Sequence, residues 1–415
     1  MKILHCLHNY FPARGGAEWL MQNISEKLTQ RGHETKVIAT NAYSVEDYFL
    51  PGKGKKLISE DEEIINGVHV KRVPFSRRST PLLYELGKVA NRVRFPFSER
   101  LRMLSWGPRS RAYRRETLNS DGFDLIAACP LPTLNIRYAW KAAKKNSLPL
   151  VIIPCFHTED PWSFRNRHYF RMLKEADAVI TLTDWEKEYL VNEGIMQDKI
   201  HTIGAGIDIS SNLPEIDIRR KYGITQEQIV LFLGQHGAHK GILDLIWAMQ
   251  FVWPEKKDIA LVIAGNPTAH TGTIERVISE LKKEEKSNVY LIKSFPEEEK
   301  RAFLKTADIF TSVSAFESFG IVFLEAWRDK VPVIGCRRGA SARLIDEFKD
   351  GLEVHYGNIK ELAGAIVELL DGSETRKRMG EAGYKKVVEN HLWDRIALKW
   401  EKVYDDTIRS HRKIN

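Results

Sequence analysis

The sequence predicts an α/β protein of two domains, each a mostly parallel sheet with helices on both faces. Apolar segments of strand length alternate with stretches of helical period along most of the 415 residues, which is typical of repeated βαβ units. A chain of this length holds two or three domains. The polar segment 208–217 (DISSNLPEID) interrupts the alternation and is the best candidate for a linker.

The first half opens with a strand, Lys2–His8, and a helix whose apolar residues recur at helical spacing from Ala17 to Leu28 and which stops at Gly32. The segment up to about residue 66 has no regular pattern, and Pro81–Leu118 predicts two basic helices. Further strands are expected at Thr35–Thr40, Val68–Val73, Leu125–Cys129, Leu150–Phe156, Val179–Leu182 and His201–Ile203.

The second half repeats the alternation after the linker. Its strands are expected at Ile229–Leu233, Ile259–Ala264, Val289–Ile292, Ile309–Val313 and Val331–Gly335. Near the end, apolar residues at helical spacing predict an amphipathic helix from about Leu392 to Arg409 that needs a surface to cover. A plain terminal helix of the second domain is the alternative for this segment.

Composition excludes several protein classes. No apolar stretch approaches the roughly 18–20 residues that span a bilayer, and the first residues turn polar too soon for a signal peptide. The four cysteines (Cys6, Cys129, Cys155 and Cys336) are far apart in the sequence, which excludes a CxxC motif and argues against a disulfide framework. We therefore expect a reduced, cytoplasmic protein.

The most informative motif is Glu317–Trp327 (ESFGIVFLEAW), which follows the expected strand Ile309–Val313 and opens a helix. Because most residues from Phe319 onward are apolar, we expect Glu325 to be buried. A buried carboxylate is costly unless hydrogen bonds meet it, so Glu325 needs a protein partner or a ligand with hydroxyl donors, such as a sugar diol. Glu317 lies just before the helix, where unpaired N–H groups favour an anion such as a phosphate.

A second motif, Gly234–Gly241 (GQHGAHKG), follows the expected strand Ile229–Leu233. A glycine-bounded turn suits a phosphate, and Lys240 supplies one positive charge for a leaving diphosphate. The Lys-Gly order differs from that of a Walker A loop. A solvated turn with an exposed lysine is the alternative. His236 and His239 have no third ligand nearby, so we expect no metal site.

Two weaker signals lie in the first half. Gly15-Gly16 joins the first strand to the first helix, where glycine permits close approach of a ligand to N–H groups, although a simple turn explains it equally well. Neither this segment nor Gly204–Ile209 has the G-x-G-x-x-G spacing of dinucleotide folds, which disfavours dehydrogenase chemistry. His157 follows an expected strand and suits a sugar hydroxyl, with an ordinary loop histidine as the alternative.

Taken in this order, the four motifs make the chain resemble the retaining GT-B glycosyltransferases of the large group 1 family, which use nucleotide-activated sugars. The resemblance covers nearly the whole chain and includes Ala176–Ile180 and Ile203–Asp208. It implies two Rossmann-like domains facing a cleft, with the last helix crossing back onto the N-terminal domain. The implied boundaries are 1–207 for the acceptor-side domain, 208–390 for the nucleotide-sugar domain and 391–415 for the helix.

The resemblance also implies roles for single residues. Glu325 would hold the ribose hydroxyls and Glu317 the donor sugar, while Lys240 would neutralise the departing diphosphate and His157 would contact the transferred sugar. His157, Lys240 and Glu317 are therefore the expected catalytic residues. No metal or cofactor is implied, because the nucleoside-diphosphate sugar is a substrate.

Further donor contacts are implied for loops that follow strands. They are Gly15, Gly16 and Gln235 in the phosphate loops, Lys293 and Phe295 beside the base, and Phe319, Gly320, Ile321 and Val322 through their backbone N–H groups.

One position departs from the family pattern, because Gln235 stands where the family usually has Arg. A missing fixed charge weakens the stabilisation of the leaving diphosphate. Arg337, Arg338 or a protonated His236 are the candidates to replace it. This keeps open a catalytically weak or inactive sugar-nucleotide-binding protein or partner subunit. A nucleotide-sugar epimerase of the same fold and a polyanion-binding protein are further alternatives.

Positive charge is concentrated in residues 71–115, which hold 13 Lys+Arg against two acidic residues in a chain of net charge +8. Arginines interleaved with apolar residues suit an interfacial amphipathic surface, so we expect adhesion to an anionic membrane that carries a lipid-linked acceptor. A solvated basic face and a nucleic-acid patch are the alternatives; we do not expect nucleic acid as a partner. The interleaved residues are Arg92, Arg94, Arg100, Arg102, Arg109, Arg111, Arg114 and Arg115, with Phe95, Phe97, Leu101, Leu104 and Trp106.

Overall fold

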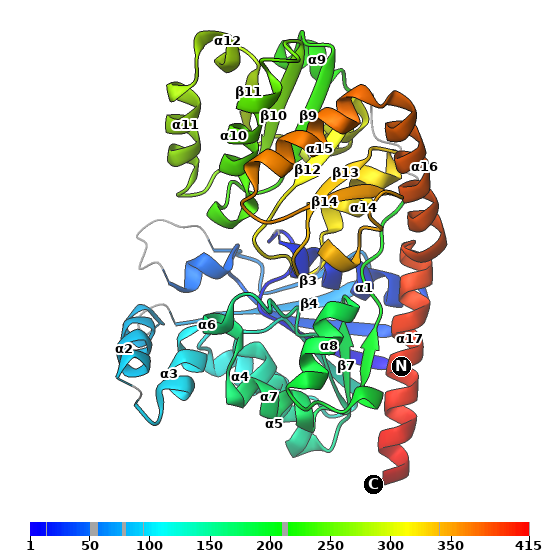
Figure 1. Ribbon diagram of the computed structural model, residues 1–415. Helices are drawn as coiled ribbons and strands as arrows, with labels where there is room; N and C mark the ends of the chain where they lie inside the picture. Colours follow the sequence, from blue (N-terminus) through cyan, green and yellow to red (C-terminus); the bar gives the residue numbers. More distant parts are fainter. Residues whose placement is uncertain are drawn as a thin grey trace. The chain divides into compact units, whose positions relative to one another are not determined.

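The computed structural model describes residues 1–13, 15–49, 57–76, 80–93, 95–209, 215–339 and 341–414 (Figure 1). The chain divides into an N-terminal unit, Met1–Gly206 with Trp393–Asn415, and a C-terminal unit, Ile207–Leu392. The two ends of the C-terminal unit meet, since the Ile207 N–H donates to the His391 carbonyl at 2.7 Å. Of the expected linker 208–217, residues 210–214 lie outside the described residues.

The N-terminal unit is a doubly wound α/β domain. Its described strands are β1 (Lys2–Leu7), β2 (Glu34–Thr40), β3 (Glu62–Ile65), β4 (Val68–Val73), β5 (Leu125–Cys129), β6 (Leu150–Ile152), β7 (Ala178–Thr181) and β8 (Ile200–Thr202). They form one sheet in the order β3-β4-β2-β1-β5-β6-β7-β8. All neighbours are parallel except β3 and β4. Every residue of β5 and β7 is buried, as expected for a sheet covered on both faces.

Helices connect most of these strands. They are α1 (Gly16–Gln30), α2 (Thr80–Arg92), α3 (Ser98–Ser105), α4 (Arg111–Leu118), α5 (Asn135–Asn146), α6 (Pro161–Phe164), α7 (Arg167–Glu175), α8 (Asp184–Asn192) and α17 (Trp393–Ile414), with 3-10 turns η1 (Val45–Tyr48) and η2 (Gln197–Lys199). No helix within the described ranges combines the length and the apolar character needed to cross a bilayer.

The last helix, α17, packs against α1 inside the N-terminal unit (Figure 1). His5 Nε2 lies 3.1 Å from the Tyr404 hydroxyl, and the Trp19 and Trp393 rings are 5.0 Å apart. Trp393, Trp400 and Tyr404 are fully buried. The apolar side of this amphipathic helix therefore has the surface that its pattern requires.

The C-terminal unit repeats the architecture. Its described strands are β9 (Gln228–Leu233), β10 (Ile259–Gly265), β11 (Val289–Lys293), β12 (Ile309–Ser312), β13 (Val333–Cys336) and β14 (Gly351–Val354). They pair in parallel in the order β11-β10-β9-β12-β13-β14. Its helices are α9 (Ile218–Tyr222), α10 (Ile242–Val252), α11 (Thr271–Glu280), α12 (Lys283–Lys286), α13 (Glu297–Thr306), α14 (Ile321–Arg328), α15 (Ile359–Asp371) and α16 (Ser373–Asn390), with 3-10 turns η3 (Ala238–Lys240) and η4 (Ser341–Arg343).

The prediction of two Rossmann-like α/β units with parallel sheets is confirmed, while several details are wrong. Residues 81–118 form three helices instead of two, because Pro96 and Pro108 interrupt the helical pattern. The segment before residue 66 contains β3, which pairs with β4 through a turn at Asn66 (φ 47°) and Gly67 (φ 84°). Strand β14 was not expected. Strand β6 ends at Ile152, before a proline, and not at residue 156.

Candidate active site

Lys240 and Glu317 form an ion pair at the carboxyl edge of the C-terminal sheet, with side chains 21% and 17% exposed. Lys240 lies in the loop after β9 and Glu317 in the loop after β12. These strands are neighbours in the sheet, and parallel neighbours end at the same edge. The Ser314 hydroxyl also donates to Glu317 Oε1 at 3.0 Å. The two loops are therefore joined by a pair of opposite charges that water and a ligand can reach.

Backbone contacts hold the two loops together. The Ala315 N–H donates to the His239 carbonyl at 2.7 Å, and the His239 and Phe316 rings stack with their centroids 4.5 Å apart. Gly241 has φ +71°, and a Cβ there would lie 2.4 Å from the Val313 carbonyl oxygen. Only glycine fits such an approach, so this glycine lets the turn after β9 lie against the end of β12.

Glu325 lies on the buried side of α14 and is 6% exposed. Lys300, from α13, forms an ion pair with its Oε1. Oε2 is buried and accepts no hydrogen bond from any described residue. A buried carboxylate oxygen without a donor is costly, so this atom suits a ligand hydroxyl. The expected protein partner of Glu325 is Lys300, while a ligand hydroxyl at its second oxygen stays a prediction.

The start of α14 supplies backbone donors beside this site. Gly320 begins the helix at φ +92°, where a Cβ would lie 2.6 Å from the Phe323 ring. Ile321 and Val322 belong to the first turn, whose N–H groups have no acceptor within the helix. Phe319 is buried, with its ring 5.9 Å from the His391 ring. The four residues predicted to contact the donor through their backbone therefore form one continuous helix start.

The two residues predicted beside the base lie at the end of β11 and just beyond it. Lys293 forms an ion pair with Glu275 of α11. Phe295 packs edge-on against Phe303, with 5.0 Å between the ring centroids. Between them, the Ser294 N–H donates to the Gly265 carbonyl at 2.9 Å, which ties this loop to the end of β10.

Gln235 is exposed, and its carbonyl accepts the Gly237 N–H at 2.7 Å. The next residue, His236, is fully buried, with Nδ1 3.3 Å from the Thr271 hydroxyl. Burial, helped by the charge of Lys293, lowers the pKa of His236, so its imidazole is neutral at pH 7. A protonated His236 as a replacement for the family's arginine is therefore disfavoured.

The two arginines considered as replacements have other contacts. Arg337 forms an ion pair with Glu347 and donates to the Glu353 carbonyl at 3.1 Å. Arg338 lies over the Tyr356 ring, 5.6 Å from its centroid. Neither of these contacts involves Lys240 or Glu317.

The remaining predicted residues belong to the N-terminal unit. His157 follows β6, and its ring meets the Phe164 ring edge-on at 5.1 Å. Gly15 precedes α1, and a Cβ there would lie 2.3 Å from a Glu18 carboxylate oxygen. A Cβ at Gly16 would meet nothing within 4 Å, so the helix start is open at that residue.

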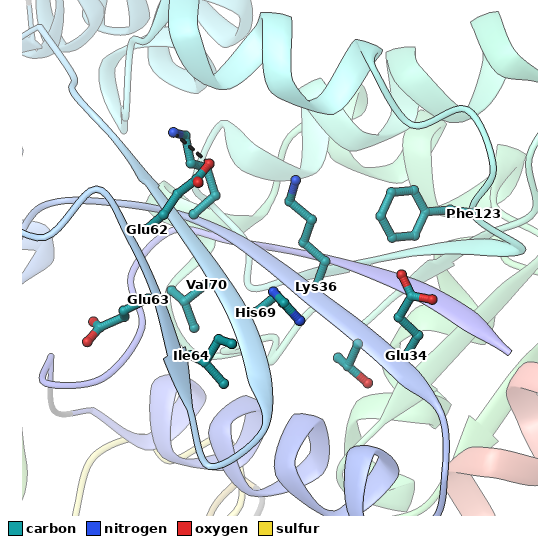
Figure 2. A pocket seen from close by; sticks show the side chains of 10 residues that line it. Glu34, Lys36, Glu62, Glu63, Ile64, His69, Val70 and Phe123 are labelled. Carbon is teal, nitrogen blue, oxygen red and sulfur yellow. Dashed lines mark ion pairs between the residues drawn. The ribbon is translucent and has the colours of Figure 1, made fainter.

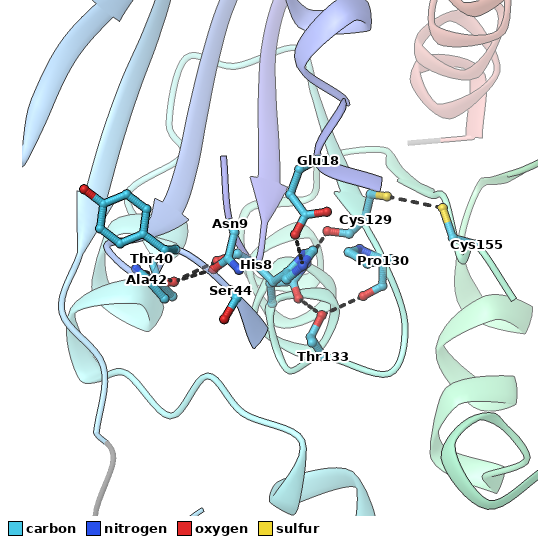
Figure 3. A network of polar contacts seen from close by, with 12 residues as sticks. His8, Asn9, Glu18, Thr40, Ala42, Ser44, Cys129, Pro130, Thr133 and Cys155 are labelled. Atoms are coloured by element: carbon cyan, nitrogen blue, oxygen red, sulfur yellow. Dashed lines mark hydrogen bonds and ion pairs between the residues drawn. The ribbon is translucent and has the colours of Figure 1, made fainter. Parts of the chain in front are cut away.

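A buried polar network at the carboxyl edge of the N-terminal sheet was not foreseen (Figure 3). His8 Nε2 lies 2.9 Å from Glu18 Oε1, and Asn9 Oδ1 accepts hydrogen bonds from the Thr40 and Tyr48 hydroxyls at 2.9 and 2.7 Å. Burial alone would raise the pKa of Glu18, but the charge of His8 and its hydrogen bond hold it below its usual value. A signal was available, because Glu18 is the third residue of α1, where an acid often caps the helix start.

An open pocket of about 490 Å³ lies elsewhere in the N-terminal unit (Figure 2). It is lined by the first residues of β2 and by the β3–β4 hairpin, and the Glu62–Lys71 ion pair, 2.9 Å long, lies along it. None of the predicted site residues is among those that line it. The pocket adjoins the amino-terminal end of β2, whereas ligands of parallel sheets bind at the carboxyl ends of the strands.

Two family models match the chain. Glycosyl transferases group 1 matches residues 215–386, and Glycosyltransferase Family 4 matches residues 14–211. Spore coat protein SA of Bacillus subtilis (strain 168) is 24% identical over 313 residues, which cover 69% of this chain and 80% of that protein. D-inositol 3-phosphate glycosyltransferase of Corynebacterium glutamicum (strain R) is 29% identical over 250 residues, which cover 57% of this chain and 59% of that protein.

Solved structures share the fold over the whole chain. Sucrose-phosphate synthase from Thermosynechococcus elongatus superposes with a TM-score of 0.74 at 18% identity, covering 99% of this chain and 100% of that one. Anabaena Alr3699/HepE in complex with UDP and glucose gives a TM-score of 0.73 at 17% identity, covering 98% and 100%. With both units matched by family models and the fold shared throughout, the chain belongs to the group 1 glycosyltransferases of the GT-B fold.

Proposed function

We propose that this protein moves a hexose from a nucleoside-diphosphate sugar to an acceptor hydroxyl, on a lipid-linked molecule or a growing glycan, with retention at the anomeric carbon. The observation that carries the proposal is the Glu325 carboxylate, buried with one oxygen unsatisfied, on the helix that directly follows the Lys240–Glu317 pair. Solved structures of Alr3699/HepE with UDP and with UDP-glucose support this class of donor. The reaction needs neither a metal nor a cofactor in this proposal.

Charge separation in the transition state defines what the site must do. As the bond to the diphosphate breaks, positive charge develops on the sugar and negative charge on the leaving group. Lys240 and the N–H groups of Ile321 and Val322 would stabilise the departing diphosphate. The diphosphate would then replace Glu317 at the Lys240 ammonium, which leaves the carboxylate to accept hydrogen bonds from the donor sugar.

Glu325 would fix the nucleoside end of the donor. Its Oε2 would accept the ribose hydroxyls, while Lys300 holds the other carboxylate oxygen in an ion pair. His157 would contact the transferred sugar, as the family resemblance implies.

We expect Lys240→Ala and Glu317→Ala each to lower turnover at least about 100-fold, the usual scale for one lost transition-state contact. Turnover is measured as nucleotide release across a panel of UDP- and GDP-sugars, and the anomeric configuration of the product is read by NMR. The matched control is Lys256→Ala, which removes another lysine of an ion pair in the same unit. Near-normal rates in either site variant, an inverted product, or a rate abolished by a chelator would each contradict the corresponding part of the proposal.

A catalytically weak or inactive sugar-nucleotide-binding protein is the second candidate. It is favoured by Gln235, because the neutral His236 beside it supplies no charge in place of the family's arginine. Calorimetric titration with the same panel distinguishes the two candidates. Donor binding without nucleotide release identifies the binding protein, and an epimerised nucleotide sugar identifies an epimerase.

A further inference from the structure

One side of α2 is apolar and exposed. The residues at positions i, i+4, i+7 and i+11 of this helix share one face, and two phenylalanines continue the exposed surface beyond its end. Single exposed apolar residues are ordinary, but a continuous set marks an interaction site. This apolar stripe, with the exposed fraction of each residue, comprises Leu82 (63%), Leu86 (47%), Val89 (60%), Val93 (67%), Phe95 (47%) and Phe97 (56%).

The stripe is exposed although α2 has tertiary contacts on another side. α2 packs along α3, and the two helices lie as a pair in Figure 1. On that packed side, Ala90 is buried and a Cβ at Gly87 would lie 3.6 Å from the Arg102 backbone. The stripe is therefore the outer side of a docked helix.

Not all the apolar residues that the sequence assigns to the interfacial surface are exposed in the structure. Leu101, Leu104 and Trp106 are half-buried, and Arg102 is buried, with its guanidinium 5.2 Å from the Trp162 ring. Three basic residues of this segment lie outside the described residues: Arg77, Arg78 and Arg94. The exposed apolar surface belongs to α2 and the turn that follows it.

One cation of α2 flanks the stripe. Arg92 lies one helical turn after Val89 and is exposed. Tyr84, Lys88 and Asn91 lie on another side of α2, where they line a pocket of about 470 Å³ together with Arg92 and Trp162. Arg92 therefore places a positive charge next to the apolar residues, as an anionic headgroup requires.

A second group of cations adjoins the α2–α3 pair. Arg100 of α3, Arg114 of α4, and Arg137 and Lys141 of α5 lie close enough for their charges to interact: the charge of Arg137, followed by burial and the charges of Arg114 and Arg100, lowers the pKa of Lys141. Burial, and then the charges of Arg100 and Arg114, lower the pKa of Arg137. None of the four forms an ion pair with a carboxylate in the described part of the chain. Such a cluster attracts external anions.

We propose that the apolar stripe of α2 docks this protein on an anionic membrane, with Arg92 and the four-cation cluster facing lipid phosphates. Aliphatic side chains on a convex helix face fit the boundary between headgroups and acyl chains, where bordering cations add attraction to anionic lipid. Nucleic acid would leave the leucines and valines without a partner, since its binding sites use cations and stacking rings. The inference concerns membrane attachment and stands apart from the sugar transfer proposed above.

Vesicle flotation of the full chain tests the proposal. We expect co-flotation with vesicles of phosphatidylcholine and phosphatidylglycerol, and none with phosphatidylcholine alone. Leu86→Ser with Val89→Ser should lower the partition coefficient at least about tenfold, because two exposed apolar side chains lose their burial. Arg100→Gln or Arg114→Gln should each lower it about fivefold, and added salt should lessen this difference.

Matched variants keep the test falsifiable. Ile64→Ser removes an apolar residue that is 65% exposed on β3, and Arg409→Gln removes an exposed arginine of the same unit. Both should bind vesicles like the wild type. Equal binding to neutral and anionic vesicles, binding to neither, or equal losses in the stripe and control variants would overturn the proposal, as would capture of the stripe by a protein or RNA that excludes vesicles.

A probe in the stripe gives a second readout. All four native cysteines are buried, so a cysteine introduced by Val89→Cys can be labelled selectively with a polarity-sensitive dye. We expect its emission to shift to the blue with anionic vesicles, while a dye at Ile64→Cys stays unchanged. No shift at position 89 in flotation-positive protein would show that another surface binds the membrane. Nucleotide release from the sugar donor in the presence of a soluble acceptor, measured in the same variants, shows separately whether the proposed transferase activity holds.

Discussion

At the carboxyl edge of the N-terminal sheet, the buried side chains of His8 and Glu18 pair and Asn9 accepts two hydroxyl donors, while His8 Nδ1 and Asn9 Nδ2 have no hydrogen-bond partner among the described residues. At the same edge of the C-terminal sheet, Lys240 and Glu317 face each other in a partly exposed ion pair, and Glu325 keeps one oxygen without a donor. Both edges come from the same parallel architecture. They differ in exposure, because the side chains of His8 and Glu18 are 4% and 10% exposed while those of Lys240 and Glu317 are 21% and 17% exposed.

The difference in exposure indicates which polar groups stabilise the fold and which can meet a ligand. Buried polar groups that pair with one another stabilise the fold, and removing one should cost stability. A partly exposed ion pair keeps its charges within reach of a ligand and contributes little to stability, so removing one of its members should change binding more than stability. Variants at the two edges should therefore fail in different assays.

The largest effect is expected for Glu18→Ala, which should lower the free energy of unfolding by about 3 kcal/mol. The variant leaves His8 buried without its acceptor and the start of α1 without its carboxylate. Denaturant unfolding at neutral pH measures the loss, with Glu34→Ala, an exposed carboxylate of the same unit, as the control. The donor KM should stay unchanged. A loss no larger than that of the control would show that the network does not stabilise the fold.

Acid should weaken the N-terminal unit through His5, whose pKa burial lowers from 6.5 to about 3. The unfolded chain takes up this proton below pH 6.5 while the folded chain does not, so stability falls as the pH drops. Between pH 6.5 and 5 the expected loss is about 2 kcal/mol. His5→Asn cannot titrate there, and its unfolding free energy should depend less steeply on pH than that of the wild type. If the unfolding free energies of the wild type and of His5→Asn depended equally on pH, this role of His5 would be excluded.

The smallest effect is expected for Glu325→Gln, which should raise the donor Kd about tenfold, or about 1.4 kcal/mol, by weakening the acceptor for the ribose hydroxyls. Glu299→Gln is the matched control, because Glu299 is also buried in this unit but pairs both oxygens, with Lys221 and Tyr222. The control should lose stability and keep its donor affinity. If Glu299→Gln weakened the donor as much as Glu325→Gln did, the unsatisfied oxygen would not be the donor contact.

Much of the architecture could be predicted, because the strands of both sheets are short apolar runs and the helices between them have clear periods. The hairpin of β3 was missed since its residues alternate without strong apolar character, although Asn66-Gly67 is a known hairpin signal. Strand β14 (GLEV) was missed because a glycine and a glutamate interrupt its apolar residues. The prediction of two helices between residues 81 and 118 was wrong, because Pro96 and Pro108 divide a segment of helical composition into three helices.

The candidate site was predictable to the extent that it is local in sequence. The motif around Glu317 and Glu325 indicates a buried acid at a helix start without any tertiary information. The partner of Glu325, however, is Lys300 from another helix, and its pairing with only one oxygen depends on packing that no local pattern contains. The exposure of the α2 stripe likewise depends on which helices lie next to each other.

The route of the chain through its two units has a practical consequence. The polypeptide leaves the first unit at Gly206, builds the second, and returns at Trp393 to complete the first. The second is thus an insertion with adjoining ends, joined at Ile207 and His391. A stop codon late in the reading frame would harm the portion translated earliest, whereas the inserted portion could be exchanged between relatives as a cassette through two neighbouring junctions.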